Sequence, residues 1–207
     1  PNNPSGKYLD SLLLKKLGNI LLKHKNIYIS SDDIYEHIHW NKEKFHNIVN
    51  ACPKLKDRVI VLNGVSKAYS MTGWRIGYAA GDKEIIKKMK TLQSQSTSCA
   101  SSISQAAACE ALSKVCEEMP LMTQEYKKRH DYVVEQLNKI DGVICKETDG
   151  TFYVFPSFRK YISNSDNIAN DNELALHLLN VAKVAVVPGS AFGQEGHIRL
   201  SIAIYID

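Results

Sequence analysis

One lysine stands in a segment that suits covalent chemistry. Lys67 lies in the run Asn-Gly-Val-Ser-Lys-Ala-Tyr-Ser-Met-Thr-Gly-Trp-Arg-Ile-Gly, which begins at Asn63. The apolar residues 59–62 precede this run, and Arg75 follows the lysine eight positions later. A lysine at the end of an apolar strand is poorly placed to be a solvated surface charge. It is well placed to lose its proton and attack a carbonyl carbon.

The residues around Lys67 decide between this chemistry and a structural role, because a single lysine in apolar surroundings is more often snorkelling or ion-paired. The segment 64–77 resembles the lysine signature of the class I pyridoxal-phosphate (PLP) aminotransferases. Three further segments match that family in the same order: Asn-Pro-Ser-Gly at 3–6, Ser-Asp-Asp-Ile-Tyr at 31–35 and Arg-Leu-Ser at 199–201. Within the family, the chain is most similar to the bacterial aspartate aminotransferase branch.

The resemblance implies the two central roles of a PLP site. Lys67 would form the Schiff base with the cofactor and, once a substrate amine has displaced it, move the proton of the substrate α-carbon. Both jobs need an uncharged amine, which desolvation and the nearby cationic Arg75 would favour. Asp32 would pair with the pyridine nitrogen and keep it protonated, so that the ring accepts carbanion charge. Asp33 is the alternative carboxylate, and Asp32 is preferred because the ring partner comes first in the family pattern.

Other residues would hold the cofactor. The resemblance implies that the Tyr35 hydroxyl and the Asn3 amide hydrogen-bond the phenolic oxygen of the cofactor. Arg75 would bind the phosphate through the forked donors of its guanidinium. Ser66, next to the lysine, is also assigned to the cofactor. Some branches of the family have Ser three positions before the lysine, and this chain has Gly64 there.

Arg199 is the candidate substrate-binding residue, together with Asn3. The resemblance implies that Arg199 clamps the substrate α-carboxylate with a forked pair of hydrogen bonds and so orients the α C–H bond. Read singly, the candidates also have structural explanations: a turn cap for Asp32, a core position for Tyr35, a turn for Asn3 and an ion pair for Arg199.

Composition excludes several other classes of protein. The 207 residues are 44% hydrophobic and 23% charged, which is ordinary globular composition, and the net charge of +4 is spread over scattered lysines. We therefore expect neither nucleic-acid binding nor, since no apolar run approaches the ~20 residues of a span, a membrane segment. The five cysteines lack a Cys-x-x-Cys spacing, which predicts reduced, buried thiols in a cytoplasmic protein. His37 and His39 have no partner at ligand spacing, so no metal site is expected.

Helical and strand-like patterns alternate through the first half of the chain. Ser5 is a candidate cap for the first helix, and Asp82 for a later one. In open α/β sheets, ligands lie at the carboxyl ends of the strands. We therefore expect one crevice to receive Asp32 and Lys67. The expected helices are 9–24, 82–95 and 101–115, with a short helix near 45–50, and the expected strands are 27–31, 59–62 and 76–80.

The second half begins with a long amphipathic helix at 118–140, followed by a change of character. Short strands are expected at 143–146, 152–156, 184–187 and 197–203, with a helix at 172–182 and a polar loop at 163–172. The predicted class is α/β, PLP-transferase fold type I. It comprises the C-terminal half of a large mixed-sheet domain, residues 1–118, and a small C-terminal α+β domain, residues 119–207.

The resemblance implies a PLP-dependent transaminase that moves the amino group of L-aspartate to 2-oxoglutarate by a ping-pong cycle, as a homodimer. The alternatives are an aromatic or prephenate aminotransferase, an inactive fragment, or an aminotransferase-like binding or regulatory module. The preserved set of candidate residues argues against decay. The chain begins within a motif and is about half as long as the family's proteins, so we expect it to be a portion of one. Its strand-like end, 204–207, is expected to be clipped.

Overall fold

A computed structural model describes residues 1–41, 43–114, 116–165 and 167–204. The chain divides into two compact units, which are described separately. Unit 1 contains Pro1–Tyr8, Ile38–Asn41 and Leu121–Asp207, and unit 2 contains Leu9–His37 and Lys42–Pro120. These units are defined by contacts within the chain and do not test the predicted domains 1–118 and 119–207. The domain assignment stays a prediction. Residues 205–207 of the strand-like end lie outside the described residues.

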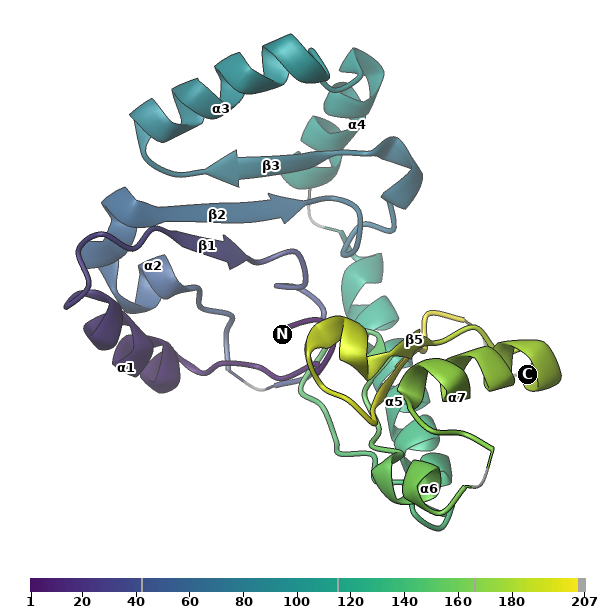
Figure 1. Ribbon diagram of the computed structural model, residues 1–207. Coiled ribbons are helices and arrows are strands. Elements are labelled where there is room, and N and C mark those ends of the chain that lie inside the picture. Colours follow the sequence, from purple (N-terminus) through teal and green to yellow (C-terminus); the bar gives the residue numbers. More distant parts are fainter. Residues whose placement is uncertain (42, 115, 166, 205–207) are drawn as a thin grey trace. The chain divides into compact units, whose positions relative to one another are not determined.

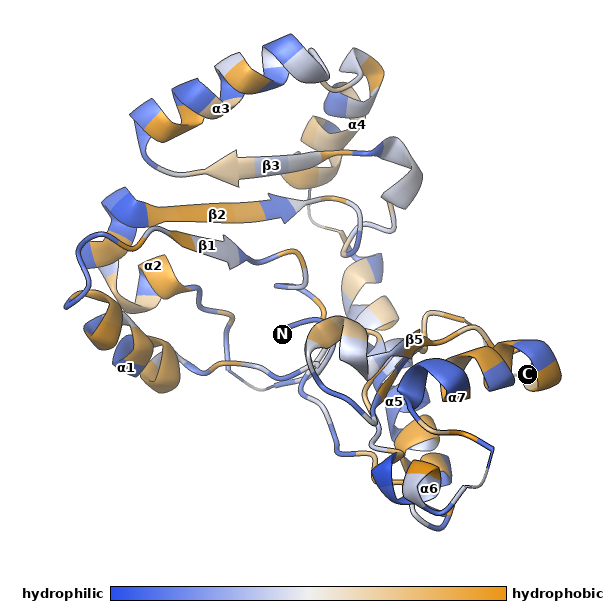
Figure 2. Ribbon diagram, viewed as in Figure 1, coloured by the Kyte–Doolittle hydropathy of each residue, from blue (hydrophilic) through white to orange (hydrophobic). Residues whose placement is uncertain are grey.

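Unit 2 is built on a mixed three-stranded sheet with the order β1-β2-β3 (Figure 1). The strands are β1 (Ile29–Asp32), β2 (Val59–Gly64) and β3 (Gly77–Ala80). β1 and β2 are parallel, with Asp32 opposite Leu62, and β3 is antiparallel to β2, with Gly77 opposite Gly64. Figure 2 shows that the central strand β2 is apolar along most of its length and becomes hydrophilic near its end. All three strands confirm the predicted ones.

The helices of unit 2 also lie where the sequence predicts them. They are α1 (Ser11–Leu21), α2 (Ile48–Ala51), α3 (Lys83–Ser96) and α4 (Ser102–Ser113), with short 3-10 helices at Pro53–Arg58 and Thr72–Trp74. Asp82 caps α3 as predicted, but the prediction for α1 was wrong: Asp10 accepts a hydrogen bond from Leu13 N–H, whereas Ser5 donates to Asn2. The core of the unit joins α1, α2 and β2 through Leu14, Ile48, Cys52, Leu55 and Val59.

Unit 1 holds a small antiparallel sheet with the order β4-β6-β5. The helix α5 (Glu118–Leu137) enters the unit at Leu121. The other elements are β4 (Tyr153–Val154), α6 (Arg159–Ser163), α7 (Asp171–His177), a π-helical continuation (Leu178–Ala182), β5 (Val187–Pro188), a 3-10 helix (Gly189–Phe192) and β6 (Ile198–Ser201). Two small cores support them, one of Val134, Cys145 and Val154, the other of Ile168, Leu174 and Ile198.

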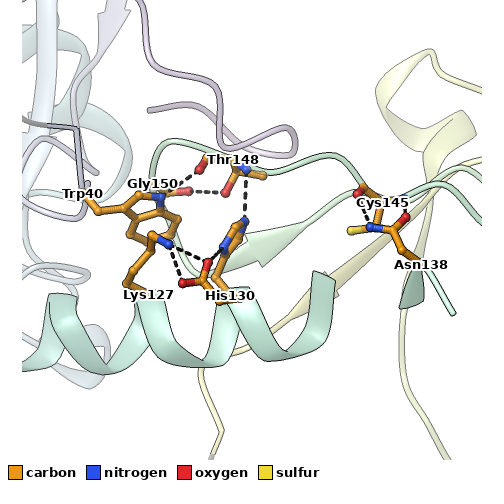
Figure 3. Close-up of polar contacts among 8 residues, drawn as sticks. Trp40, Lys127, His130, Asn138, Cys145, Thr148 and Gly150 are labelled. Atoms are coloured by element: carbon orange, nitrogen blue, oxygen red, sulfur yellow. Dashed lines mark hydrogen bonds and ion pairs between the residues drawn. The ribbon is translucent and has the colours of Figure 1, made fainter. Parts of the chain in front are cut away.

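The strand predicted at 143–146 was wrong. A single bridge pairs Ile144 with Ser157, and the next residue is held by a side chain instead of a ladder. The Asn138 amide donates to Cys145 O and accepts from Cys145 N–H, both at 2.8 Å (Figure 3). One side chain therefore satisfies both backbone groups that a strand neighbour would have paired.

The cysteines are free thiols with unequal exposure. Cys52 and Cys145 are buried as predicted, and burial raises the pKa of Cys145 to about 11. Cys99 and Cys109 are exposed, so the prediction of buried thiols was wrong for these two. None of the helices among the described residues is long and apolar enough to cross a membrane. The same residues contain no group of three or more His, Cys, Asp or Glu that could hold a metal ion.

Candidate active site

The lysine cluster, which we define as Asp32, Tyr35, Ser66, Lys67 and Arg75, belongs to unit 2 and follows from the sheet register. Asp32 ends β1, and Lys67 follows the end of the parallel strand β2. Arg75 directly precedes the antiparallel strand β3, whose first residues pair with the last residues of β2. The turns that carry these three side chains therefore emerge at one edge of the sheet.

The structure separates the two adjacent carboxylates by environment. Asp32 is exposed, and one long hydrogen bond of 3.4 Å reaches it from Ile34 N–H. Asp33 is buried, with an exposed fraction of 6%, and both of its oxygens accept hydrogen bonds, one from Ser31 and one from Asn47. Burial is the largest influence on Asp33 and raises its pKa, although the two hydrogen bonds oppose the shift. Asp33 therefore serves the fold, and Asp32 is the carboxylate available to a ligand.

Lys67 lies in a turn whose backbone is closely packed. Val65 and Ala68 on either side of it are buried, and Ser70 N–H donates to Lys67 O at 3.2 Å. A Cβ atom at Gly64 would come within 2.8 Å of Ile76 O, so only glycine lets the two chain segments approach this closely. The turn thus fixes the backbone from which the half-buried Lys67 projects.

Arg75 combines an exposed guanidinium with an unusual backbone. Its φ of 57° and ψ of 46° lie in the left-handed region, which residues other than glycine seldom adopt. One donor of the guanidinium is used locally, in a 3.0 Å hydrogen bond from Nη1 to Thr72 O. The other donors remain available to an anion.

Glu36, which was not predicted as a site residue, links two of the chain segments that carry the lysine cluster. Its Oε1 accepts a 2.6 Å hydrogen bond from the Asn63 amide and lies 3.4 Å from His37 Nε2. This bond joins the turn after β1 to the strand that leads to Lys67. Burial and, next, the negative charge of Glu36 raise the pKa of Tyr78 on β3, so that its phenol stays protonated.

Arg199 and Asn3 form a second cluster, in unit 1. Arg199 Nη1 donates to Asn3 Oδ1 at 2.8 Å, across 196 positions of sequence. The guanidinium carbon lies 4.5 Å from the ring centroid of Tyr153 and 5.1 Å from that of Phe192. We call Asn3, Tyr153, Phe192 and Arg199 the arginine cluster. Within the part of the chain that the structure describes, Asn3 is the one hydrogen-bond partner of this guanidinium.

The small sheet and the turn before β6 bring these aromatic rings to Arg199. β6 pairs with β4 on one side and β5 on the other, with Tyr153 opposite Ser201 and Val187 opposite Arg199. Phe192 ends the 3-10 helix that follows β5. Rings on which a guanidinium stacks hold it by cation–π attraction while leaving its N–H edge free for a carboxylate.

The geometry does not test the roles predicted for Tyr35, Asn3 and Ser66. Tyr35 is buried with an exposed fraction of 6% in unit 2, whereas Asn3 belongs to unit 1, and their joint contact with one cofactor oxygen stays a prediction. Ser66 is half-buried beside Lys67, and its role also stays a prediction. The ion pair considered for Arg199 is not what the described residues show, since its partner is the neutral amide of Asn3.

The sequence profile of the family described as "Aminotransferase class I and II" matches residues 1–205. The chain belongs to this family, whose enzymes depend on pyridoxal phosphate. It is 46% identical to the aspartate/prephenate aminotransferase of Nitrosomonas europaea, over 100% of this chain and 53% of that protein. It is 44% identical to an aspartate aminotransferase of Rhizobium meliloti, over 98% of this chain and 50% of that protein. The chain thus spans about half the length of the relatives it matches.

Solved structures show the same fold. The crystal structure of the aspartate aminotransferase from Rhizobium meliloti superposes with a TM-score of 0.92 at 42% identity, over 99% of this chain and 52% of that one. An aromatic aminotransferase from Pyrococcus horikoshii gives a TM-score of 0.87 at 33% identity, over 99% of this chain and 54% of that one. The predicted fold, half of a fold type I aminotransferase, is confirmed.

Proposed function

We propose that this chain carries the lysine-bearing half of a PLP-dependent aminotransferase, and that its substrates are L-aspartate and 2-oxoglutarate. The observation that supports this most strongly is the single sheet edge at which a carboxylate, an amine and a guanidinium emerge. These three groups match the ring nitrogen, the aldehyde and the phosphate of PLP. The donor set therefore fits the cofactor.

The lysine cluster divides the work of holding PLP. Asp32 would keep the ring nitrogen protonated, Arg75 would bind the phosphate with the donors that Thr72 O does not use, and Lys67 would hold the aldehyde carbon. Tyr35 and Ser66 complete the assignment. When bound, the cofactor supplies an electron sink for the charge left by a departing α-proton.

Lys67 Nζ also acts as the acid and base of the reaction. Once the substrate amine has displaced it from the cofactor, the freed Lys67 amine would take the proton from the substrate α-carbon and hold it for return. This transfer needs the uncharged amine and a fixed path, and the packed turn at 64–68 holds the lysine backbone in one place.

The arginine cluster binds the carboxylate that all amino-acid substrates share. Arg199 is fixed by two rings and one amide, so little conformational entropy is lost when a carboxylate docks on its remaining donors. Asn3 Oδ1 orients the guanidinium, and its amide N–H₂ can donate to the same substrate.

The choice of aspartate as the amino donor derives from relatives. The proteins of similar sequence include aspartate aminotransferases and aspartate/prephenate aminotransferases. Prephenate is accordingly the second candidate substrate, and assays with each oxo acid separate the two. A homodimer and a cytoplasmic location also stay predictions.

A spectral experiment tests the proposal. The purified protein mixed with PLP should show a visible band that depends on pH, and Lys67→Ala should lack it. The band should respond to L-aspartate in the parent protein. An unchanged band in the Lys67→Ala variant would defeat the assignment.

A further inference from the structure

A corner of unit 1, residues 148–151, connects three distant segments of the chain. Thr151 N–H donates to Ile38 O at 2.8 Å, and the Trp40 indole donates to Thr148 O at 2.8 Å. Behind the corner, the buried His130 of α5 accepts Thr148 N–H on Nε2 at 3.0 Å (Figure 3). Since Nε2 accepts, the ring proton is on Nδ1, which faces Asp131 Oδ1 at 2.9 Å. The buried His130 therefore holds the backbone of the corner at Thr148.

Asp149 connects the corner to the N-terminal segment of the chain. Its backbone N–H donates to Gly6 O at 3.0 Å, and its backbone oxygen accepts from Trp40 N–H at 3.1 Å. Its carboxylate Oδ2 accepts from Tyr8 N–H at 3.0 Å and lies 2.8 Å from Lys7 Nζ. Asp149 thus contacts Gly6, Lys7 and Tyr8, which follow Asn3 of the arginine cluster in the sequence.

A tight turn connects Gly6, which is bonded to Asp149, with Asn3. Gly6 N–H donates to Asn2 O at 2.8 Å, which closes the turn that contains Asn3. Gly6 has a φ of +62°, and a Cβ there would come within 2.6 Å of Gly150 O. The turn is therefore pressed against the corner, and a shift of the corner would move Asn3.

We propose that Asp149 is a positioning residue for the arginine cluster: it fixes the 6–8 segment so that Asn3 Oδ1 meets Arg199 Nη1. This role rests on the proposed function, in which Arg199 binds the substrate carboxylate. Asp149 acts through Asn3 and does not touch the substrate. Losing its side chain should therefore weaken carboxylate binding, while the contacts proposed between the cofactor and Asp32, Lys67 and Arg75 stay as they are.

The side-chain chemistry predicts which variants matter. The Lys7 ammonium is largely exposed, with an exposed side-chain fraction of 66%, so its ion pair with Asp149 contributes little. The hydrogen bond from Tyr8 N–H is the contact that orders the backbone. Asp149→Asn keeps an acceptor oxygen for this bond, whereas Asp149→Ala removes it. Glu147→Ala is the matched control, because Glu147 is exposed two positions away and no bond to it exists among the described residues.

The experiment measures kcat and KM for L-aspartate with 2-oxoglutarate in the PLP-loaded full chain. We expect Asp149→Ala to raise KM about tenfold, the loss of roughly one well-placed hydrogen bond, with kcat and the affinity for PLP close to the parent's. Asp149→Asn should recover most of the KM, and Glu147→Ala should match the parent. A fall in kcat and cofactor affinity as large as the rise in KM would mean general damage and would overturn the role.

A double-mutant cycle tests whether the effect passes through Asn3. If it does, Asp149→Ala added to Asn3→Ala raises KM no further. If the two substitutions multiply each other's effect on KM, the proposal is overturned.

Hydrogen exchange supplies a readout that needs no activity. The Tyr8 amide should exchange faster in Asp149→Ala than in Glu147→Ala, and equal rates would contradict the hydrogen bond from Tyr8 N–H to Asp149. An active parent with an unaffected Asp149→Ala variant sinks this inference alone. A parent that binds no PLP sinks the proposed function and this role with it.

Discussion

The lysine cluster comes from one continuous stretch of the chain, residues 32–75, whereas the arginine cluster joins Asn3 to Arg199 across 196 positions. The first is organised by hydrogen bonds between neighbouring strands, which place three strand-end turns at one sheet edge. The second depends on side chains: an amide, two rings and the corner at 148–151. The residues of the lysine cluster therefore form recognisable motifs in the sequence, whereas those of the arginine cluster are scattered along it.

The contrast also concerns what each cluster requires of its neighbours. Strand pairing fixes the lysine cluster through the backbone. The arginine cluster has side chains committed to holding one guanidinium. We therefore expect substitutions in the lysine cluster to abolish chemistry, and substitutions around the arginine cluster to weaken binding in graded steps.

The largest effect is expected at Asp32. In the proposed site, Asp32→Asn would remove the charge that keeps the ring nitrogen protonated, and we expect the transamination rate to fall by about 10²- to 10³-fold, the scale of losing one preorganised electrostatic partner. Single-turnover absorbance with L-aspartate measures this rate. The variant should bind PLP and fold like the parent.

Asp33→Asn is the matched control for Asp32. It places an amide where the Asn47 amide now donates, so we expect a loss of about 1–3 kcal/mol in the free energy of unfolding. The rate per folded molecule should stay near that of the parent. If Asp33→Asn lowered the rate more than Asp32→Asn, the two carboxylates would have been assigned the wrong way round.

A graded effect is expected at Arg199. Arg199→Lys keeps a positive charge but loses the forked donors and the stacking on Tyr153 and Phe192. We expect KM for the amino acid to rise roughly 10- to 100-fold, the scale of one charge-assisted hydrogen bond. Titration of the cofactor band should show nearly unchanged PLP affinity. Equal losses of both affinities would count against the separate tasks of the two clusters.

The smallest effect is the dependence of stability on pH at Asp149. Burial disfavours its charged form, but the hydrogen bonds from Lys7 and Tyr8 N–H and the charge of Lys7 outweigh this, so its pKa lies below the ordinary 3.8. A folded-state pKa below the unfolded one means that the carboxylate stabilises the fold above about pH 4. That contribution is lost as the pH falls through the folded pKa.

Urea unfolding at pH 7 and pH 3 compares the parent with Asp149→Asn. The parent should lose more stability on acidification, because the variant has no carboxylate to protonate at this position. The other carboxylates with lowered pKa values, Asp131 and Asp171, are common to both proteins and cancel in the comparison. Identical losses would show that Asp149 is not stabilised as an anion.

Much of the fold could be predicted because periodicity and chemistry coincide in single segments. The apolar run 59–62, the turn after it and Arg75 identify a strand end, and β2 and β3 lie there. The cap of α1 and the strand at 143–146 were wrong because polar side chains competed for the backbone. Asp10 lies nearer the helix start, and Asn138 occupies both bonding groups of Cys145. Asp10 directly precedes α1 and could have been found from the sequence, whereas the contact of Asn138 with Cys145 is known only from the structure.

The partners of Arg199 could not have been assigned from the sequence. Tyr153 reaches it through the register of β4 on β6, and Phe192 through the turn that follows β5. Glu36 and Asp149 likewise look like surface acids until their hydrogen-bond partners are known. The roles of the lysine cluster, by contrast, came from a motif and stay predictions until they are measured.

The most direct test of the account is to locate the amine that carries the cofactor. The PLP-loaded protein is treated with borohydride, digested, and mapped by peptide mass. We predict a single cofactor adduct, on Lys67 in the peptide that contains Gly-Trp-Arg. An adduct on another lysine, or none in a protein that binds PLP, would contradict the account.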